Sequence, residues 1–165
     1  MSGDNFLENY EGQPTDRLIA LEATHRIDSL VLAFESAIDA KRELGKALSK
    51  PETVVLAVEA MEREVNNGGF SQFFYNSSVE FAPVIVDSLI AIGCPQAAEL
   101  ADRAIASLEL DTLDPEVIEA RMDPDDEELE NKLNGIDEQY YEGTEAIANQ
   151  LFQYIKENQP EITIP

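Results

Sequence analysis

Residues 51–69 read PETVVLAVEAMEREVNNGG and carry the clearest helical pattern in the chain. Pro51 is favourable at the first position of a helix. After it, apolar residues recur at the spacing of one buried helical stripe, formed by Val54, Val58, Met61 and Val65. The pattern ends at Asn66-Asn67-Gly68-Gly69, because asparagine and glycine tolerate the left-handed backbone that stops a helix. The stretch therefore predicts a helix followed by a sharp turn.

Upstream, the residues from Asp16 to Leu48 predict another helix with one buried stripe. The apolar residues at this spacing are Ile27, Leu30, Val31, Phe34, Ala37, Ile38, Leu44 and Leu48. Asp28, Glu35 and Asp39 fall on the opposite face of the same helix.

Downstream of the turn, the sequence is first aromatic and then aliphatic. Phe70, Phe73, Phe74 and Phe81 predict an aromatic plug that fills the space between longer helices. Residues 83–93, PVIVDSLIAIG, are apolar almost all round and predict a central buried helix. Residues 97–108 predict an amphipathic helix beside it.

The segment from Glu109 to Glu145 is strongly acidic. It contains 15 acidic residues and only two basic residues, Arg121 and Lys132. Regularly placed apolar residues remain throughout the segment, which indicates that it folds onto the core instead of forming a disordered tail.

Two prolines in the acidic segment predict helix starts. Asp114-Pro115-Glu116 and Asp123-Pro124-Asp125 each offer a capping aspartate, a proline at the first helical position and acid in the first turn. Asn134-Gly135 predicts a helix stop, Thr144 to Asn158 predicts a last helix, and residues 161–165 are expected to be coil. Together the patterns predict an all-α fold: one domain over residues 1–165, with seven to nine helices, several of them short.

The net charge limits the function classes. The chain has 34 acidic and 11 basic residues, a formal net charge of -23 and a pI near 4.1. Such a surface repels nucleic acid and anionic membranes and attracts basic proteins. We therefore expect no direct nucleic-acid binding and no membrane partner. The single cysteine, Cys94, and the absence of a signal-peptide or membrane-spanning pattern lead us to expect a cytoplasmic protein.

Candidate catalytic and metal-binding residues are few. His25 is the only histidine, and Cys94 has no basic neighbour in sequence that would lower its pKa. Asp123, Asp125 and Glu127 match positions one, three and five of a calcium-binding loop. The match fails at position six, which is Glu128, and at position twelve, which is Asn134. We expect no catalytic residues, no metal site and no cofactor.

The acidic surface has three readings: a solvated surface, an adaptation to high salt, or a mimic of nucleic acid. Neighbouring acids on a helix lie roughly 5–6 Å apart at Cβ, and duplex DNA carries one charge per about 1.7 Å of its axis, so folded acidic helices can approximate a phosphate array. The residues predicted to mimic phosphates are Asp28, Glu35, Asp39, Asp111, Asp114, Glu116, Glu119, Asp123, Asp125, Asp126, Glu127, Glu128, Glu130, Asp137 and Glu138.

A longer motif surrounds the glycine turn. The pattern E-V-N-N-G-G-F-x-Q-F-F-Y-N-S falls on Glu64 to Ser77, followed by Ile92-Gly93, Pro95 and an alanine-rich helix at Ala97 to Ala106. In this region the chain resembles a bacterial family of small proteins typified by an acidic DNA mimic. The resemblance implies an all-helical fold and a homodimer that occupies the DNA-binding surface of a transcription regulator, with the helix-turn-helix type favoured.

Two further functions remain open. The chain could be an acidic scaffold whose basic partner has no connection with DNA. Alternatively, Asn66, Asn67, Gln72 and Asn76 could line an enzyme pocket, although amides alone rarely supply acid, base or nucleophile. The structural interpretation, in which these signature residues define the turn and the core, is the favoured one.

Overall fold

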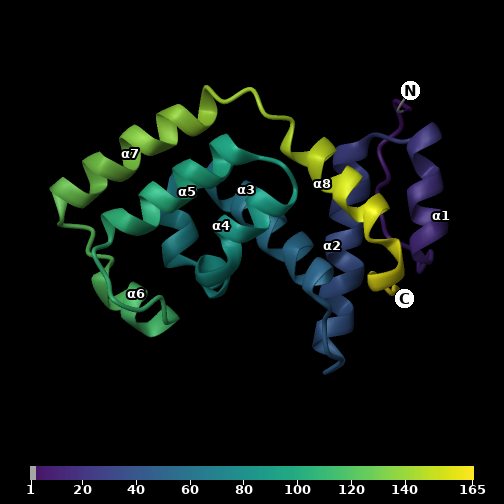
Figure 1. Cartoon of the computed structure of the whole chain (residues 1–165), viewed down its shortest axis with the longest axis horizontal. Coiled ribbons are helices and arrows are strands. Elements are labelled where there is room, and N and C mark those ends of the chain that lie inside the picture. The colour runs from purple at the N-terminus through teal and green to yellow at the C-terminus, as the bar shows by residue number, and fades with distance from the viewer. Residues whose placement is uncertain (1–2) are drawn as a thin grey trace. The chain divides into compact units, whose positions relative to one another are not determined.

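The computed structural model describes residues 3–165, and the fold is all-α, as predicted (Figure 1). In this range the α-helices are α1 Thr15–Ala20, α2 Ile27–Glu43, α3 Lys50–Tyr75, α4 Ala82–Ala91, α5 Pro95–Ser107, α6 Pro115–Arg121, α7 Glu127–Tyr141 and α8 Ile147–Glu157. Short 3-10 helices are η1 Leu21–Ala23, η2 Ser77–Phe81 and η3 Gln159–Glu161. Within the described residues, no helix combines the length and apolar content needed to cross a bilayer.

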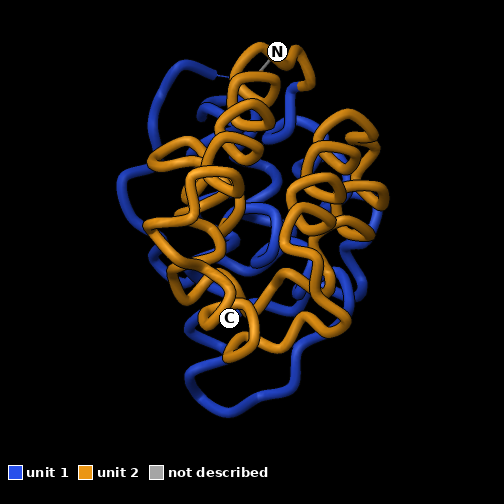
Figure 2. The backbone as a smooth tube through the Cα atoms, turned by 90° about the vertical axis from the view of Figure 1, so that its left-hand side faces the viewer, with its two compact units in different colours: residues 1–59, 146–165 blue, residues 60–145 orange. Residues whose placement is uncertain are grey.

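The chain divides into two compact units (Figure 2). Unit 1 contains the residues up to Glu59 together with Ala146–Pro165, and unit 2 contains Ala60–Glu145. The first part of α3 therefore belongs to unit 1, and its remainder belongs to unit 2. That residues 1–165 behave as one domain stays a prediction.

Unit 1 is built around the packing of α2 against α8. Leu30, Phe34 and Ile38 of α2 are fully buried, as are Leu151 and Ile155 of α8. α8 corresponds to the predicted last helix, although α8 begins at Ile147 and not at Thr144. The core of this unit is therefore mainly aliphatic and aromatic, although the acids Glu52 and Glu59 of α3 are also buried.

The last residues of the chain are also tied into unit 1. Ile162 and Ile164 are buried, and the carbonyl of Ile162 accepts a hydrogen bond from the Thr15 hydroxyl at 2.5 Å. Lys41 pairs with the buried carboxylate of Glu52 at 2.7 Å and also donates to the Thr163 hydroxyl. Residues 162–165 are coil, as predicted, whereas Glu161 belongs to η3.

The helix predicted from Asp16 to Leu48 is interrupted, so this prediction was wrong in its extent. α1 ends at Ala20, and α2 begins only at Ile27. The backbone amide of Arg26 donates to the carbonyl of Asn5 at 2.7 Å, so a strand-like contact takes the place of a helical bond. α2 ends at Glu43 because Gly45 has a left-handed φ of 77°, which ends the helix. Leu44, beyond the end of the helix, is 74% exposed.

Unit 2 has an aromatic core. Phe70, Phe73 and Phe74 are each at most 1% exposed, and Phe81 is also buried, so the predicted core role of these rings is confirmed. The Phe70 ring meets Tyr140 of α7 edge to face, with centroids 6.0 Å apart. Around this cluster α5 packs against both α4 and α7.

The helix at 83–93 is buried on one side only, which corrects the prediction of burial all round. Ile85 and Leu89 of α4 are fully buried, whereas Val84 is 36% and Ile90 is 59% exposed. α4 contacts α5 and η2, which cover a single face of it. Its uniform apolar composition therefore overstates its burial.

The acidic segment folds as predicted at Asp114 but not at Asp123. α6 begins at Pro115, as expected, although the Asp114 side chain makes no capping bond. Pro124 and Asp125 form a turn, and α7 begins at Glu127 with Asp126 as its cap. The Asp123 side chain instead accepts a bond from the Asp125 amide at 2.9 Å, which stabilises the turn.

The predicted helix stop at Asn134-Gly135 is also wrong, because α7 continues to Tyr141. Leu129, Leu133, Ile136 and Tyr140 are all buried along one face of this helix. Their packing outweighs the cost of about 1 kcal/mol that a helical glycine carries.

Candidate functional site

The Gly68-Gly69 turn breaks α3 where the sequence predicts a sharp turn. Gly68 has φ -157° and ψ 19°, and Gly69 has φ 76° and ψ -176°, a combination open essentially to glycine alone. A Cβ atom on Gly69 would lie 2.1 Å from Asp137 Oδ2. Gly69 is therefore required both by its backbone angles and by the close approach of α7.

The polar residues of the signature motif bond mostly to one another. One carboxylate oxygen of Glu64 accepts hydrogen bonds from Gln72 Nε2 and Asn76 Nδ2, each at 2.7 Å. Asn66 Nδ2 donates to Glu62 at 3.2 Å, and the Tyr140 hydroxyl donates to the same carboxylate. These bonds explain the motif as a clamp that holds the two parts of α3 around the turn, and they support its structural role.

Asp137 is an exception among the predicted phosphate mimics. Its side chain is buried, and it accepts a hydrogen bond from the Phe70 amide at 2.8 Å. Burial raises the pKa of the Asp137 carboxyl, although the Phe70 hydrogen bond opposes the rise. Burial likewise raises the pKa of Glu62. The Asp137 carboxylate holds the turn and does not face a partner, which corrects its assignment.

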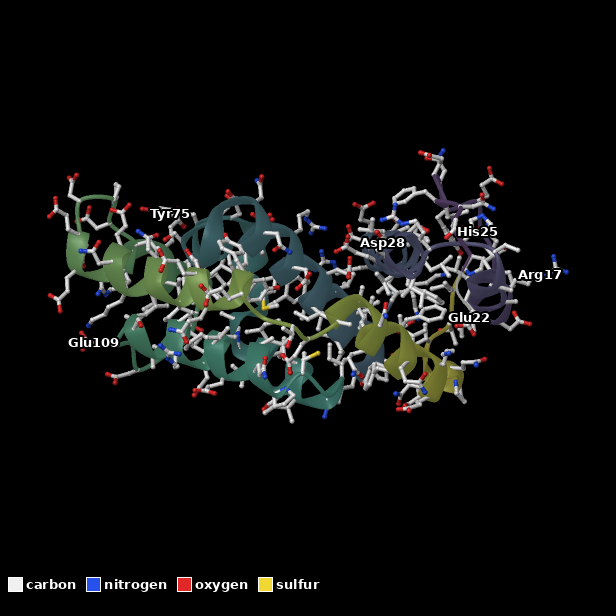
Figure 3. The ribbon with its side chains drawn as sticks, turned by 90° about the horizontal axis from the view of Figure 1, so that it is seen from above. Arg17, Glu22, His25, Asp28, Tyr75 and Glu109 are labelled. Atoms are coloured by element: carbon white, nitrogen blue, oxygen red, sulfur yellow. The ribbon has the colours of Figure 1, made fainter. Side chains whose placement is uncertain are left out.

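Most of the other predicted acids of unit 2 are exposed. Asp126 is partly buried, and the exposed residues are Asp111, Asp114, Glu116, Glu119, Asp123, Asp125, Glu127, Glu128, Glu130 and Glu138. We call these ten residues the acidic surface. Nine of them lie between Asp111 and Glu130, on α6, its flanking loops and the first turn of α7. Oxygen-tipped side chains project outward around this end of the unit, near the labelled Glu109 (Figure 3).

Arg121 gives the α6–α7 loop a defined shape. Its Nε donates to the Leu108 carbonyl at 3.0 Å, and its Nη1 lies 2.9 Å from Asp126 Oδ2. The other oxygen of Asp126 accepts from the Leu129 amide at 3.0 Å and caps α7. The Leu129 amide and the Arg121 guanidinium hold the pKa of Asp126 below its usual value. Sequence reasoning missed this role of Arg121, because the predicted capping aspartate was Asp123 and not Asp126.

The three predicted mimics of unit 1 differ from the acidic surface. Asp28 pairs with Arg26 at 2.5 Å, and Asp39 pairs with Arg42 at 2.9 Å. Glu35 is half-buried. Among the described residues of the acidic surface, by contrast, only Glu128 pairs with a basic side chain, that of Lys132 at 3.5 Å. The charge that is open to a partner is thus greatest in unit 2.

The two residues considered for chemistry are in ordinary settings. Cys94 is fully buried. Burial, followed by the nearby charges of Glu145 and Glu62, raises the pKa of its thiol to about 11, so the thiol stays protonated at neutral pH. His25 is half-buried, and its Nδ1 lies 2.8 Å from the Thr24 hydroxyl. Neither arrangement activates a nucleophile or a base.

Of the comparisons with known proteins, one gives a match. Neither a curated protein nor a solved structure matches the chain. A family model described as DMP19-like protein matches residues 46–158, which is about two thirds of the chain and includes the glycine turn, the acidic surface and all of α8. The chain belongs to the DMP19-like protein family.

Proposed function

We propose that this protein is a DNA mimic, which binds the DNA-contacting surface of a basic DNA-binding protein and prevents that protein from binding DNA. The observation that carries the proposal is the acidic surface: ten exposed carboxylates on one folded segment, with a single cationic side chain paired to them in the described chain. Membership of the DMP19-like family supports the same function.

The physical basis is electrostatic. A DNA-binding protein gains affinity when its lysines and arginines displace counterions from phosphates. Cations held near the acidic surface are released in the same way when a basic protein replaces them. Because the carboxylates stand on helices and on a loop fixed by Arg121, little conformational entropy is lost when the partner binds.

The partner class follows from the arrangement of its own charges. Proteins that dock in the grooves of DNA already present basic residues at phosphate spacing. We infer a transcription regulator, with the helix-turn-helix type favoured, and the action of this chain as a homodimer. Sedimentation equilibrium of the purified protein tests the homodimer independently of the partner.

A second candidate function is an acidic scaffold for a basic protein that does not bind DNA. It uses the same surface and the same salt dependence, so charge alone does not separate the two functions. Competition with DNA separates the two functions. A mimic and DNA exclude each other from the partner, whereas a scaffold and DNA do not.

The test is a capture experiment with immobilised protein and cell extract at low salt. One half of the loaded resin is eluted with excess duplex DNA and the other half with high salt. The mimic function predicts that duplex DNA releases a discrete DNA-binding protein, which then loses its DNA in a mobility-shift assay when our protein is added. Release by salt alone, with no effect of DNA, would favour the scaffold.

A further inference from the structure

A small pocket opens within the acidic surface of unit 2. Its volume is about 160 Å³, and it lies between the end of α3, the α6–α7 loop and the first turns of α7. Drug-sized ligands occupy pockets of about 300–1,000 Å³, so this pocket suits a single side chain. The residues that matter for its chemistry are Tyr75, Met122, Asp123, Leu129, Glu130 and Leu133.

The rim of the pocket carries negative charge. Asp126 also lines the pocket, but its carboxylate is paired with Arg121. Asp123 and Glu130 are exposed, and neither forms an ion pair with a basic side chain of the described residues. The net charge of the rim therefore attracts a cation.

The floor and one wall of the pocket are apolar or aromatic. Met122, Leu129 and Leu133 form the buried lining, and Tyr75 is 46% exposed. Tyr75 lies beside the N-terminal half of α7 (Figure 3). A hydrated metal ion gains nothing from such a floor, and in the described part of the chain no three acidic, histidine or cysteine side chains converge to hold one.

The combination fits one kind of cationic group best. Arginine carries an apolar stem, which can cover Leu129 and Leu133, and a planar guanidinium, which stacks on aromatic rings and bonds carboxylates with two parallel N–H groups. The lysine ammonium is a compact and strongly hydrated charge, so it matches the aromatic wall less well.

We propose that this pocket receives one arginine side chain of the DNA-binding partner, an inference that rests on the proposed function. The stem lies on Leu129 and Leu133, the guanidinium stacks on the Tyr75 ring, and Asp123 and Glu130 accept its hydrogen bonds. A phosphate array has no apolar floor. The pocket therefore lets the protein distinguish among basic partners, which its overall charge alone does not.

The direct test uses N-acetyl-arginine methylamide as the probe and follows the backbone amide resonances of the full chain by NMR. Its citrulline counterpart has nearly the same shape but no charge. Its lysine counterpart has the charge but no planar group. We expect saturable shifts centred on Tyr75, Asp123 and Glu130 with the arginine probe, at least about threefold weaker binding of the lysine probe, and no binding of citrulline.

Two variants and one control locate the binding. Tyr75→Leu removes the ring but keeps apolar volume, and Glu130→Gln removes one rim charge. Each is expected to weaken the arginine probe about three- to tenfold. Glu138→Gln removes an exposed acid of the same helix that does not line the pocket, and it should leave binding unchanged. Equal shifts with the citrulline probe, or equal losses of arginine affinity in all three variants, would overturn the proposal that the pocket binds arginine.

The capture experiment separates this inference from the proposed function. If a Tyr75→Leu/Glu130→Gln double variant still captures the DNA-eluted partner with unchanged affinity, the pocket has no role in partner binding. The proposed function as a DNA mimic is then unaffected. Specific arginine binding without any DNA-eluted partner supports arginine recognition by the pocket and overturns the mimic.

Discussion

Asp137 accepts a hydrogen bond from the backbone amide of Phe70, although the two residues are 67 positions apart in the sequence. The bond is 2.8 Å long and joins α7 to the residue that follows the glycine turn. On the other side of that turn, the Tyr141 hydroxyl donates to the Val65 carbonyl at 2.6 Å. α7 thus holds the turn from both sides, and the stability of unit 2 depends on this contact.

Substitution of Gly69 by alanine should destabilise the protein by about 3 kcal/mol. The φ of 76° is strained for any residue with a Cβ atom, and the new methyl group would meet the Asp137 carboxylate. Urea denaturation followed by circular dichroism measures the loss.

Gly135→Ala is the matched control for Gly69→Ala. Gly135 is in the interior of α7, and nothing lies within 4 Å of a Cβ atom built there. Alanine should therefore stabilise the helix by up to about 1 kcal/mol. Similar effects of the two substitutions would contradict the account of the turn.

Replacement of Asp137 by asparagine should change how stability depends on pH. The pKa of Asp137 is raised in the folded state, so the folded protein binds its proton more tightly than the unfolded chain does. Its contribution to stability is present below the unfolded pKa of about 3.9 and is lost as pH rises through the raised folded pKa. Asparagine keeps an oxygen for the Phe70 amide but does not ionise.

The measurement is the free energy of unfolding of the wild type and of Asp137→Asn between pH 4 and pH 8. We expect the wild type to lose stability relative to the variant as pH rises over this interval. A difference between the two proteins that does not change with pH would show that Asp137 does not titrate as its burial indicates.

The cap of α7 should also be measurable. Asp126→Ala removes the acceptor for the Leu129 amide and should destabilise the start of α7. Asp126→Asn loses the ionic pairing with Arg121 but keeps an oxygen acceptor, so it should cost less. Hydrogen exchange at the Leu129 amide should be faster in Asp126→Ala than in Asp126→Asn, and equal exchange in the two variants would argue against the cap.

Partner binding should depend on where charge is removed. The quadruple variant Glu116→Gln/Glu119→Gln/Glu127→Gln/Glu130→Gln neutralises four members of the acidic surface. Its affinity for the DNA-eluted partner at low salt should fall roughly tenfold or more, and the dependence of affinity on salt should become shallower. Isothermal titration calorimetry at several salt concentrations gives both quantities.

A second quadruple variant controls for net charge. Asp4→Asn/Glu8→Gln/Glu11→Gln/Glu99→Gln removes the same number of exposed carboxylates from outside the acidic surface. It should bind the partner nearly as well as the wild type. If both variants lost affinity equally, only total charge would matter and mimicry would fail as a mechanism.

Local patterns were sufficient to predict much of this fold. The helix from Pro51, its break at Gly68-Gly69 and the start of α6 at Pro115 follow from periodicity and from residues with restricted backbones. Long-range contacts account for the errors. The break before α2 depends on the Asn5 carbonyl, and the continuation of α7 through Gly135 depends on the core beneath it.

In the candidate site, too, local patterns predicted some features, and long-range contacts determined the others. An acidic run in the sequence indicates exposed carboxylates, and ten of the twelve predicted in unit 2 are exposed. Asp137 looks like its neighbours in composition, and only its helical spacing from Leu133 and Tyr140 marks it as part of the buried stripe. The Phe70 amide that it bonds could not be identified, because no local pattern relates two residues so far apart.

The clamp around the glycine turn has an evolutionary consequence. Glu64, Gln72 and Asn76 satisfy one another inside the motif, and none of the ten acids of the acidic surface takes part in those bonds. Substitutions in the acidic surface therefore remove none of the hydrogen bonds that Glu64 makes with Gln72 and Asn76 around the turn. Under the proposed function, substitutions on the acidic surface alone would therefore suffice to change the partner, while the bonds that hold the turn stay in place.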